Sequence, residues 1–263
     1  MKWFFALSEA SLGHPGHDWE SLIRVALRSA RARTSLEPHF VYDGAENAFT
    51  AEMRAAGVVI HPHRVTFYNA LVENRRRAVG HADPMYVAIA AGAYLRCEIP
   101  LIETADEFVL YTDCDVMFLS DPPVAAFRPA FFACAPQRDR ADYVDFNTGV
   151  MVMNLPALRS TLPPLVSFIG EHSGRFGAFD QDAYREGYPG QCSPLPPELN
   201  WKPYWGASPS ASIVHFHGPK PSAARRLRDD PGYAPPPIWR ELYSENPAGY
   251  AAYLEQWEQF AGA

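Results

Sequence analysis

The first half of the chain alternates short apolar runs with amphipathic segments. Residues 3–7 and 39–42 have the length and composition of buried strands, and residues 58–60 predict a third. Between them, residues 18–33 carry apolar side chains at helical spacing behind Asp18, a suitable N-cap, and residues 47–56 predict a shorter helix. This alternation predicts a parallel sheet with right-handed crossovers, whose ligands bind at the carboxyl ends of the strands.

In the second half, Asp83-Pro84 predicts the start of a longer helix that ends at Ile99-Pro100. A strand over residues 108–111 then leads directly into Asp113-Cys114-Asp115. Further strands are expected at residues 131–135, 150–154 and 212–216, an ordered proline-rich loop at 191–210, and helix at 238–260. The predicted fold class is α/β, a Rossmann-like mixed sheet flanked by helices. We expect one domain over residues 1–236 and a helical extension over 237–263 packed on it.

Composition limits the possible functions. The 263 residues are 48% hydrophobic and 13% aromatic, enough for a large packed core, and the net charge of −7 argues against a nucleic-acid partner. No stretch approaches the ~20 apolar residues of a transmembrane segment, so none is expected. The four cysteines lack CxxC spacing, which argues against a zinc site and favours a reducing, cytoplasmic location. The run Arg75-Arg76-Arg77 is interpreted as a solvated surface.

Two D-x-D tripeptides occur, Asp113-Cys114-Asp115 and Asp180-Gln181-Asp182. The first follows an apolar strand, so its carboxylates are expected on a loop at the carboxyl edge of the sheet, where they can converge on a cation. Carboxylate oxygens suit Mg²⁺ or Mn²⁺, and an added imidazole favours Mn²⁺. From these residues alone, turn and cap chemistry explains the aspartates equally well.

Further motifs change that balance. They occur in the order Tyr94-Leu95-Arg96-Cys97-Glu98-Ile99-Pro100, Val109-Leu110-Tyr111-Thr112-Asp113-Cys114-Asp115, Phe146-Asn147-Thr148-Gly149-Val150-Met151-Val152-Met153-Asn154-Leu155, Asp180-Gln181-Asp182, and His215-Phe216-His217-Gly218-Pro219-Lys220-Pro221. In these stretches the sequence resembles glycosyltransferase family 8, which contains glycogenin and bacterial lipopolysaccharide galactosyltransferases. The resemblance covers roughly residues 90 to 221.

The resemblance implies a GT-A fold and a metal-dependent hexosyltransferase. Such an enzyme moves a hexose with retention of configuration from a nucleotide sugar, here expected to be UDP-linked, to a carbohydrate or other hydroxyl acceptor. Asp113, Asp115 and His215 would hold Mn²⁺ or Mg²⁺ against the diphosphate. Lys220 would contact the diphosphate as a point charge, and Gly218 would let the backbone approach closely.

The family also implies roles for residues between these motifs. Asn147 and Gly149 would contact the donor sugar and acceptor, and Asp180 and Gln181 would lie at the anomeric centre as the catalytic pair. Arg96 would lie near the donor.

The chain departs from the family at two places. The last motif is one residue shorter between Gly218 and Lys220 and lacks the tryptophan after its proline. The first strand also lacks the usual aspartate and asparagine. Ala6, Ser8 and Glu9 are therefore assigned to the base and ribose by position alone.

Each residue also has a purely structural explanation. His215 could be a core histidine, Lys220 an exposed loop lysine, and Asp180 a helix N-cap. Asn147 and Gly149 could simply begin a strand, and Arg96 could bridge to an interior acid.

Two other functions compete with the transferase. One is a catalytically weak nucleotide-sugar-binding protein. The other is a haloacid-dehalogenase-type phosphatase, which needs threonine soon after the second aspartate, whereas Val116-Met117 follows here.

Overall fold

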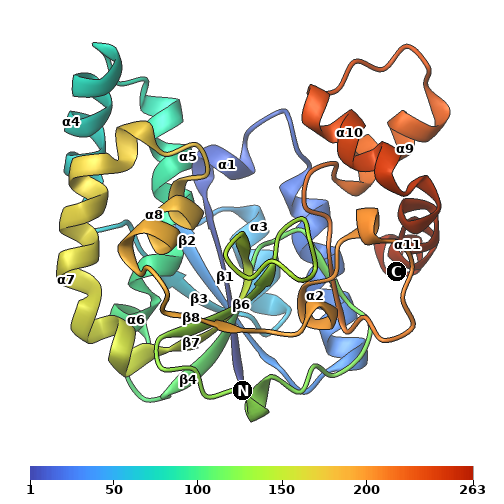
Figure 1. Cartoon of the computed structure of the whole chain (residues 1–263), viewed down its shortest axis with the longest axis horizontal. Helices are drawn as coiled ribbons and strands as arrows, with labels where there is room; N and C mark the ends of the chain where they lie inside the picture. The colour runs from blue at the N-terminus through green and yellow to red at the C-terminus, as the bar shows by residue number, and fades with distance from the viewer. Residues whose placement is uncertain (263) are drawn as a thin grey trace. The chain divides into compact units, whose positions relative to one another are not determined.

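Seven strands form one mixed sheet, ordered β3-β2-β1-β4-β7-β6-β8 (Figure 1). They are β1 (Lys2–Ser8), β2 (Glu37–Asp43), β3 (Val59–Pro62), β4 (Phe108–Thr112), β6 (Phe132–Pro136), β7 (Phe146–Asn154) and β8 (Cys192–Pro194). The strands β1 to β4 are parallel, β7 is antiparallel to both β4 and β6, and β8 is parallel to β6. The structure is a computed structural model that describes residues 1–262. The predicted mixed sheet is confirmed.

The chain divides into two compact units, each made of several segments. The first contains the sheet and comprises Met1–Gly16, Glu37–Thr112 and Pro123–Leu195. The second comprises His17–Leu36, Asp113–Pro122 and the chain from Pro196 onward. The helices after residue 236 belong to this second unit, and the division of the chain into residues 1–236 and 237–263 stays a prediction.

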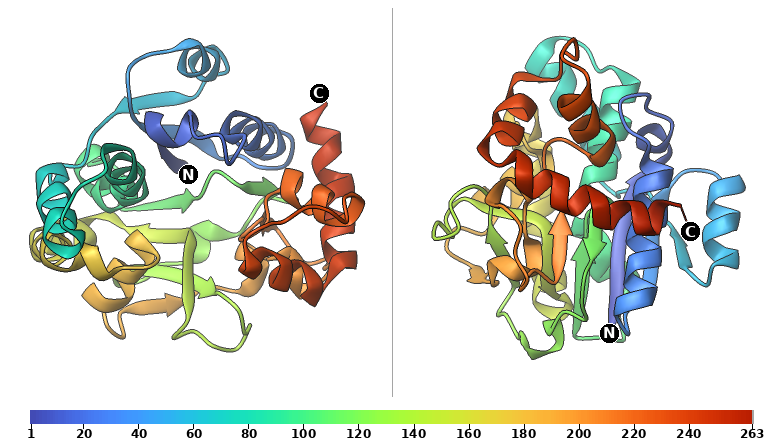
Figure 2. Two further views of the ribbon diagram at one scale, coloured as in Figure 1. Left: turned by 90° about the horizontal axis from the view of Figure 1, so that it is seen from above. Right: turned by 90° about the vertical axis from the view of Figure 1, so that its right-hand side faces the viewer.

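One face of the sheet carries the core of the first unit. Alternate strand residues such as Phe4, Val109 and Met151 pack there against α4, α5, α7 and α8, which also contact one another (Figure 2). The helices of this unit are α1 (Glu9–Leu12), α3 (Ala48–Ala55), α4 (Tyr68–Val79), α5 (Pro84–Tyr94), α6 (Ile99–Ile102), α7 (Leu155–His172) and α8 (Phe179–Gly187), with short 3₁₀ turns η1 (Leu95–Glu98), η2 (Val124–Ala126) and η3 (Ser173–Arg175).

The second unit has its own core, in which α2 and α11 pack around a small ribbon. The strands β5 (Val116–Phe118) and β9 (Ile213–His215) pair antiparallel. The remaining elements are α2 (Trp19–Arg33), α9 (Pro221–Asp229), α10 (Pro237–Glu245), α11 (Pro247–Ala261), η4 (Pro197–Asn200) and η5 (Pro203–Trp205). Leu22 and Val25 of α2 share this core with Tyr253 and Trp257 of α11.

Several helix ends match their sequence signals. Asp18 accepts a hydrogen bond from Ser21 N, and Asp83 accepts one from Met85 N with Pro84 in the first turn. The helical stretch expected over residues 238–260 is present as two helices, because Asn246-Pro247 ends α10 and begins α11. The side chain of Asn246 accepts a hydrogen bond from Gly249 N and so caps the new helix.

α4, which occupies most of residues 61–81, was not predicted. α7 was not predicted, and it contains Pro163 and Pro164. Neither proline has an N–H to donate to the carbonyl four residues earlier, but both lie on the exposed face of α7, where water can satisfy those carbonyls.

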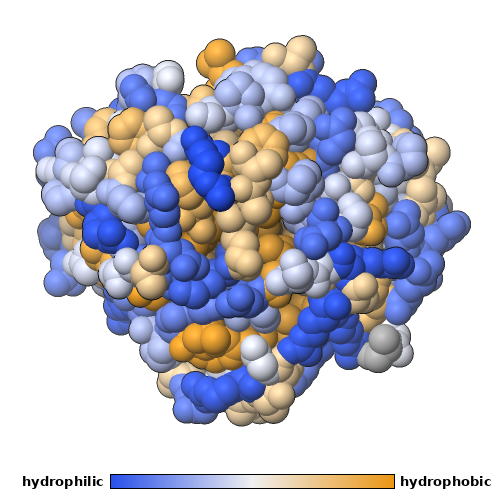
Figure 3. All heavy atoms as spheres, turned by 90° about the horizontal axis from the view of Figure 1, so that it is seen from below, coloured by the Kyte–Doolittle hydropathy of each residue, from blue (hydrophilic) through white to orange (hydrophobic). Residues whose placement is uncertain are grey.

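Within residues 1–262, one helical run, Pro84–Ile102, is long and apolar enough by length and composition to cross a membrane. Most of it is buried inside the protein, and a core helix of a globular protein meets the same test. Exposed large apolar side chains are scattered over separate elements: Val59, Val79, Met85, Leu101, Val144 and Ile238. Figure 3 shows hydrophilic and hydrophobic residues interspersed on one face.

Candidate functional site

Three predicted metal ligands come together in the second unit. Asp113 and Asp115 lie in the turn between β4 and β5, and His215 ends β9. In the antiparallel ladder His215 pairs with Val116, and Phe216 N donates to Asp115 O at 2.9 Å. This register places the imidazole beside both carboxylates, with Nε2 of His215 3.4 Å from Asp115 Oδ1 and 3.7 Å from Asp113 Oδ2.

The geometry of this triad fits a divalent cation. One ligand atom of each residue lies within 4.8 Å of the others. In an octahedral site with bonds of about 2.1 Å, neighbouring ligands are about 3 Å apart and opposite ligands about 4.2 Å. The two measured distances fall between these values, and two carboxylates with one imidazole suit Mn²⁺ or Mg²⁺.

A hydrogen bond fixes which nitrogen of His215 faces the carboxylates. Nδ1 lies 3.0 Å from Asn200 Oδ1, and an amide oxygen can only accept, so Nδ1 carries the proton. When the ring is neutral, as a metal ligand must be, its lone pair is then on Nε2, on the side of Asp113 and Asp115. Such an outer partner is what orients a metal-binding histidine. Because His215 is 2% exposed, its ring cannot turn freely.

Lys220 forms an ion pair with Asp115 Oδ2, and its ammonium also donates to Phe216 O at 3.3 Å. Burial raises the pKa of Asp115, but the charges of Lys220 and His215 and their hydrogen bonds outweigh it and hold the pKa far below the usual range. Asp115 is therefore a carboxylate at every ordinary pH. Lys220 is part-buried and not an exposed loop lysine.

Gly218 lies between His215 and Lys220 with φ of +87°, a conformation that favours glycine. A Cβ there would also lie 2.5 Å from Leu242 Cδ1. The neighbouring His217 is half-buried, and desolvation together with the electrostatic influence of His215 holds its pKa well below its usual value.

The predicted catalytic residues lie in the first unit, at the start of α8. Asp180 Oδ2 is 3.1 Å from Arg96 Nη1 and accepts a hydrogen bond from Thr148 Oγ1 at 2.9 Å. Arg96 Nη1 also donates to Thr148 O at 2.8 Å, and its guanidinium lies over the Tyr111 ring. Arg96 thus bridges to an interior acid, the alternative considered for it. Asp180 is not a helix N-cap.

Gln181 is held by three hydrogen bonds. Its Oε1 accepts from Asn147 Nδ2 at 3.0 Å and from Thr148 N at 3.1 Å, and its Nε2 donates to Gln137 Oε1 at 2.6 Å. Gly149 N donates to Asn147 Oδ1 at 3.1 Å. The structure therefore brings Asn147, Gly149 and Gln181 into one buried network, in which both lone pairs of Gln181 Oε1 are engaged.

A hollow of about 370 Å³ lies at the carboxyl ends of β1 and β2 in the first unit. Ser8 and Glu9 line it. Asp43 and Arg64 form an ion pair in its wall, in which the single nitrogen Nε of Arg64 lies 3.0 and 3.2 Å from the two carboxylate oxygens. The hydroxyl of Ser8 is already used to cap α1. Ala6 lies two residues earlier and is buried in β1.

Some residues of these sites were not predicted. Asn200 lies in the proline-rich stretch, where nothing in the spacing points to a histidine fifteen positions away. Thr148 and Gln137 have no sequence signal either. Asp43 does have one, because it ends β2 and the carboxyl ends of parallel strands bind ligands.

Several solved structures that resemble this fold are glycosyltransferases. The galactosyltransferase LgtC, in complex with donor and acceptor sugar analogues, is 16% identical over 100% of this chain and 95% of its own, with a TM-score of 0.66. GlyE of Streptococcus pneumoniae TIGR4 is 14% identical over 98% of this chain, with a TM-score of 0.62. This chain spans only 63% of the length of GlyE. Mouse xyloside xylosyltransferase 1 is 15% identical over 82% of this chain and 98% of its own, with a TM-score of 0.56.

At these identities the likeness shows the fold, and the GT-A fold expected from the sequence is confirmed. No protein-family model matches the sequence, and no curated protein matches it.

Proposed function

We propose that the protein is a metal-dependent, retaining glycosyltransferase that moves a hexose from a UDP-sugar to a carbohydrate or other hydroxyl acceptor. The observation that carries the proposal is the triad of Asp113, Asp115 and His215, with His215 Nε2 turned toward both carboxylates by Asn200. A charged site of this kind, in a fold shared with glycosyltransferases, supports binding of a cation and a diphosphate.

The metal, when bound, would supply positive charge against the leaving diphosphate. Lys220 adds a second positive charge within the same unit, and Asp115 stays ionised throughout. In the transfer step, the acceptor oxygen bonds to the anomeric carbon as the bond from that carbon to the diphosphate oxygen breaks. The diphosphate leaves with the electron pair and takes the acceptor proton.

The first unit would supply the contacts to the sugar. Asp180 and Gln181 are the proposed catalytic pair, Asn147 and Gly149 the donor-sugar and acceptor contacts, and Arg96 holds Asp180 in place. Gln181 has no free lone pair on Oε1 for attack on the sugar, which supports same-face transfer without a covalent intermediate. Ser8 and Glu9, in the hollow beside Asp43 and Arg64, are proposed to contact the base and ribose.

A donor screen tests the proposal. Release of nucleoside diphosphate is measured across common sugar nucleotides, with and without Mn²⁺, and with a mixture of hydroxyl acceptors. The proposal expects Mn²⁺-dependent release of UDP. Binding of donors without turnover would favour the nucleotide-sugar-binding protein instead, and release of inorganic phosphate alone would favour the phosphatase.

A further inference from the structure

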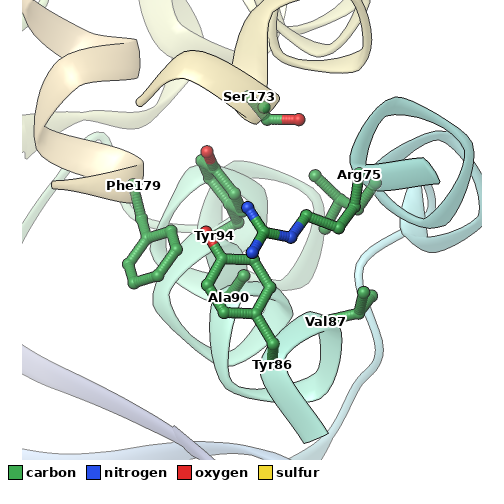
Figure 4. Close-up of a pocket in the computed structure, with 9 residues that line it drawn as sticks. Arg75, Tyr86, Val87, Ala90, Tyr94, Ser173 and Phe179 are labelled. Carbon is green, nitrogen blue, oxygen red and sulfur yellow. The ribbon is translucent and has the colours of Figure 1, made fainter. Parts of the chain in front are cut away.

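A second feature of the first unit is a small pocket between α4, α5, η3 and the start of α8. Arg75 enters it from α4, Tyr86 and Tyr94 from α5, Ser173 from η3 and Phe179 from α8. Figure 4 shows the Arg75 side chain reaching over the Tyr86 ring toward Tyr94, with Phe179 across from them. The enclosed space is about 10 Å³, close to the ~10–15 Å³ that a single water or ligand oxygen needs.

Two buried polar atoms of this pocket find no hydrogen-bond partner in residues 1–262. They are Nε of Arg75 and the hydroxyl of Tyr94. Tyr94 is 0% exposed, so water outside the protein cannot satisfy its hydroxyl. Leaving a buried donor unpaired costs about 1–3 kcal/mol, which makes two such atoms around one space unusual.

Arg75 also has no counter-ion among residues 1–262. The sequence analysis interpreted Arg75-Arg76-Arg77 as a solvated surface, but only the last two residues fit that description: Arg76 pairs with Glu73 and Arg77 donates to Gly170 O on the exposed side of α4. Arg75 forms no ion pair in the described part of the chain. Its guanidinium carbon lies 4.0 Å from the Tyr86 ring centroid. Stacking on a ring covers the face of a guanidinium and leaves its N–H edge free to donate.

These features define the chemistry of the missing partner. Nε of Arg75 can only donate, so the partner must be an oxygen, and the unpaired positive charge favours an anionic one. The space of about 10 Å³ admits only the leading oxygen of a group, so the rest of the molecule must lie outside it. A carboxylate meets both conditions, because it is planar and its oxygens match the edge of a guanidinium. The rings of Tyr86 and Phe179 supply apolar walls for the rest of the molecule.

The pocket adjoins the proposed catalytic pair. Phe179 immediately precedes Asp180 and Gln181, and its ring contacts those of Tyr86 and Tyr94. Its φ of +41° is in the left-handed region, which is rare for a bulky residue. Tyr94 lies two residues before Arg96, the partner of Asp180.

We propose that this pocket binds the carboxylate of an acidic acceptor sugar through Arg75 and Tyr94. The reading as an acceptor site rests on the proposed function, whereas the binding of a carboxylate does not. One carboxylate oxygen enters the space and accepts a hydrogen bond from the hydroxyl of Tyr94, and the carboxylate also accepts from the guanidinium of Arg75. Ser173, whose hydroxyl makes no hydrogen bond in the described residues, is available as a third donor.

Binding of D-glucuronate to the full chain tests this proposal, with D-glucose as the matched neutral sugar at equal ionic strength. Calorimetry and thermal melting are measured for the wild type, Arg75→Lys, Tyr94→Phe and the control Arg76→Lys. We expect saturable binding of glucuronate to the wild type and the control, and about tenfold weaker binding to the other two variants, the loss of one charge-assisted hydrogen bond. Without ligand, Tyr94→Phe should melt no lower than the wild type, because the hydroxyl has no partner to lose.

Three outcomes overturn the proposal. Equal binding of D-glucose would show that the pocket takes neutral sugars. An equal loss of glucuronate affinity in Arg76→Lys would show a general charge effect. Absence of saturable glucuronate binding to the wild type would show that only water enters. None of these results would affect release of UDP from a donor, so this inference and the proposed function fail separately.

Discussion

His215 can coordinate a cation only through Nε2, because Asn200 accepts the proton on Nδ1. Asn200 would therefore influence a bound metal without touching it. Replacing such an outer partner typically weakens metal affinity by about ten- to a hundredfold. Asn200 is fully buried, so a variant that tests the role of its amide must keep the volume of the side chain.

Asn200→Leu, which keeps that volume, should lower the affinity for Mn²⁺ by about ten- to a hundredfold. The Mn²⁺ affinity is measured by titration calorimetry, and thermal melting shows whether the variant folds. Unchanged Mn²⁺ affinity in a folded variant would mean that Asn200 does not orient the ligand.

Lys220 is the second residue whose role can be isolated. If it neutralises charge on the leaving diphosphate, Lys220→Ala should lower kcat by about a hundredfold, a few kcal/mol of transition-state stabilisation. Arg225→Ala, which removes a half-buried arginine of α9 that pairs with Glu258, serves as the control. If Lys220→Ala keeps the wild-type kcat and KM for the donor, Lys220 serves only as the ion-pair partner of Asp115.

Among the elements, β2 and β3 carry a pair of histidines that makes stability depend on pH. His39 Nδ1 lies 2.9 Å from His61 Nε2, and the two rings stack beside Phe4. Burial, followed by the charges of His61 and Lys2, lowers the pKa of His39 to about 4. Burial also lowers the pKa of His61.

Because the unfolded pKa is about 6.5, the unfolded chain binds more protons than the folded one between pH 6.5 and 4. The stabilisation from neutral His39 is complete above pH 6.5 and is lost as the pH falls to about 4. It amounts to at most about 3 kcal/mol. His39→Phe, which keeps a ring in the stack, should flatten the fall in the free energy of unfolding over this range, measured by urea denaturation. If the free energy of unfolding of His39→Phe falls with pH as steeply as that of His81→Gln, an exposed control, this account is refuted.

The elements also show what sequence patterns can predict. Strands with long apolar runs and helices with N-caps, such as Asp18 and Asp83, were located because their signals are local. α7 was missed because two prolines usually end a helix, and α4 because its run of arginines resembles a surface segment. The strand expected at residues 212–216 corresponds to β9, whereas β5 was not predicted, because it has three residues and pairs with a distant segment that local patterns do not reveal.

The same limit applies to the sites. Asp113, Asp115 and His215 could be chosen from the sequence because their motifs match a known family, and the structure brings them together. Asn200, Gln137 and Thr148 complete the networks through contacts across 15, 44 and 33 positions of the chain. No spacing rule connects residues that far apart.

For the whole molecule, the proposed chemistry predicts the stereochemistry of transfer. Gln181 Oε1 is engaged by Asn147 and Thr148, so we expect same-face attack and an α-linked product from an α-linked donor. Proton NMR of the fresh product, recorded before any hydrolysis or mutarotation, identifies the anomer. A β-anomeric signal would exclude the retaining mechanism while leaving the metal site unaffected.

The central claim is that Asp113, Asp115 and His215 hold a metal against the diphosphate of the donor. Calorimetric titration of UDP, with ADP and GDP in parallel, tests it in the wild type, in Asp115→Ala and in Asp121→Ala, an exposed aspartate beyond the same strand β5. The account predicts tight UDP binding only with Mn²⁺, lost in Asp115→Ala and retained in Asp121→Ala. Nucleotide binding that is the same without Mn²⁺, or the same in a folded Asp115→Ala variant, would contradict it.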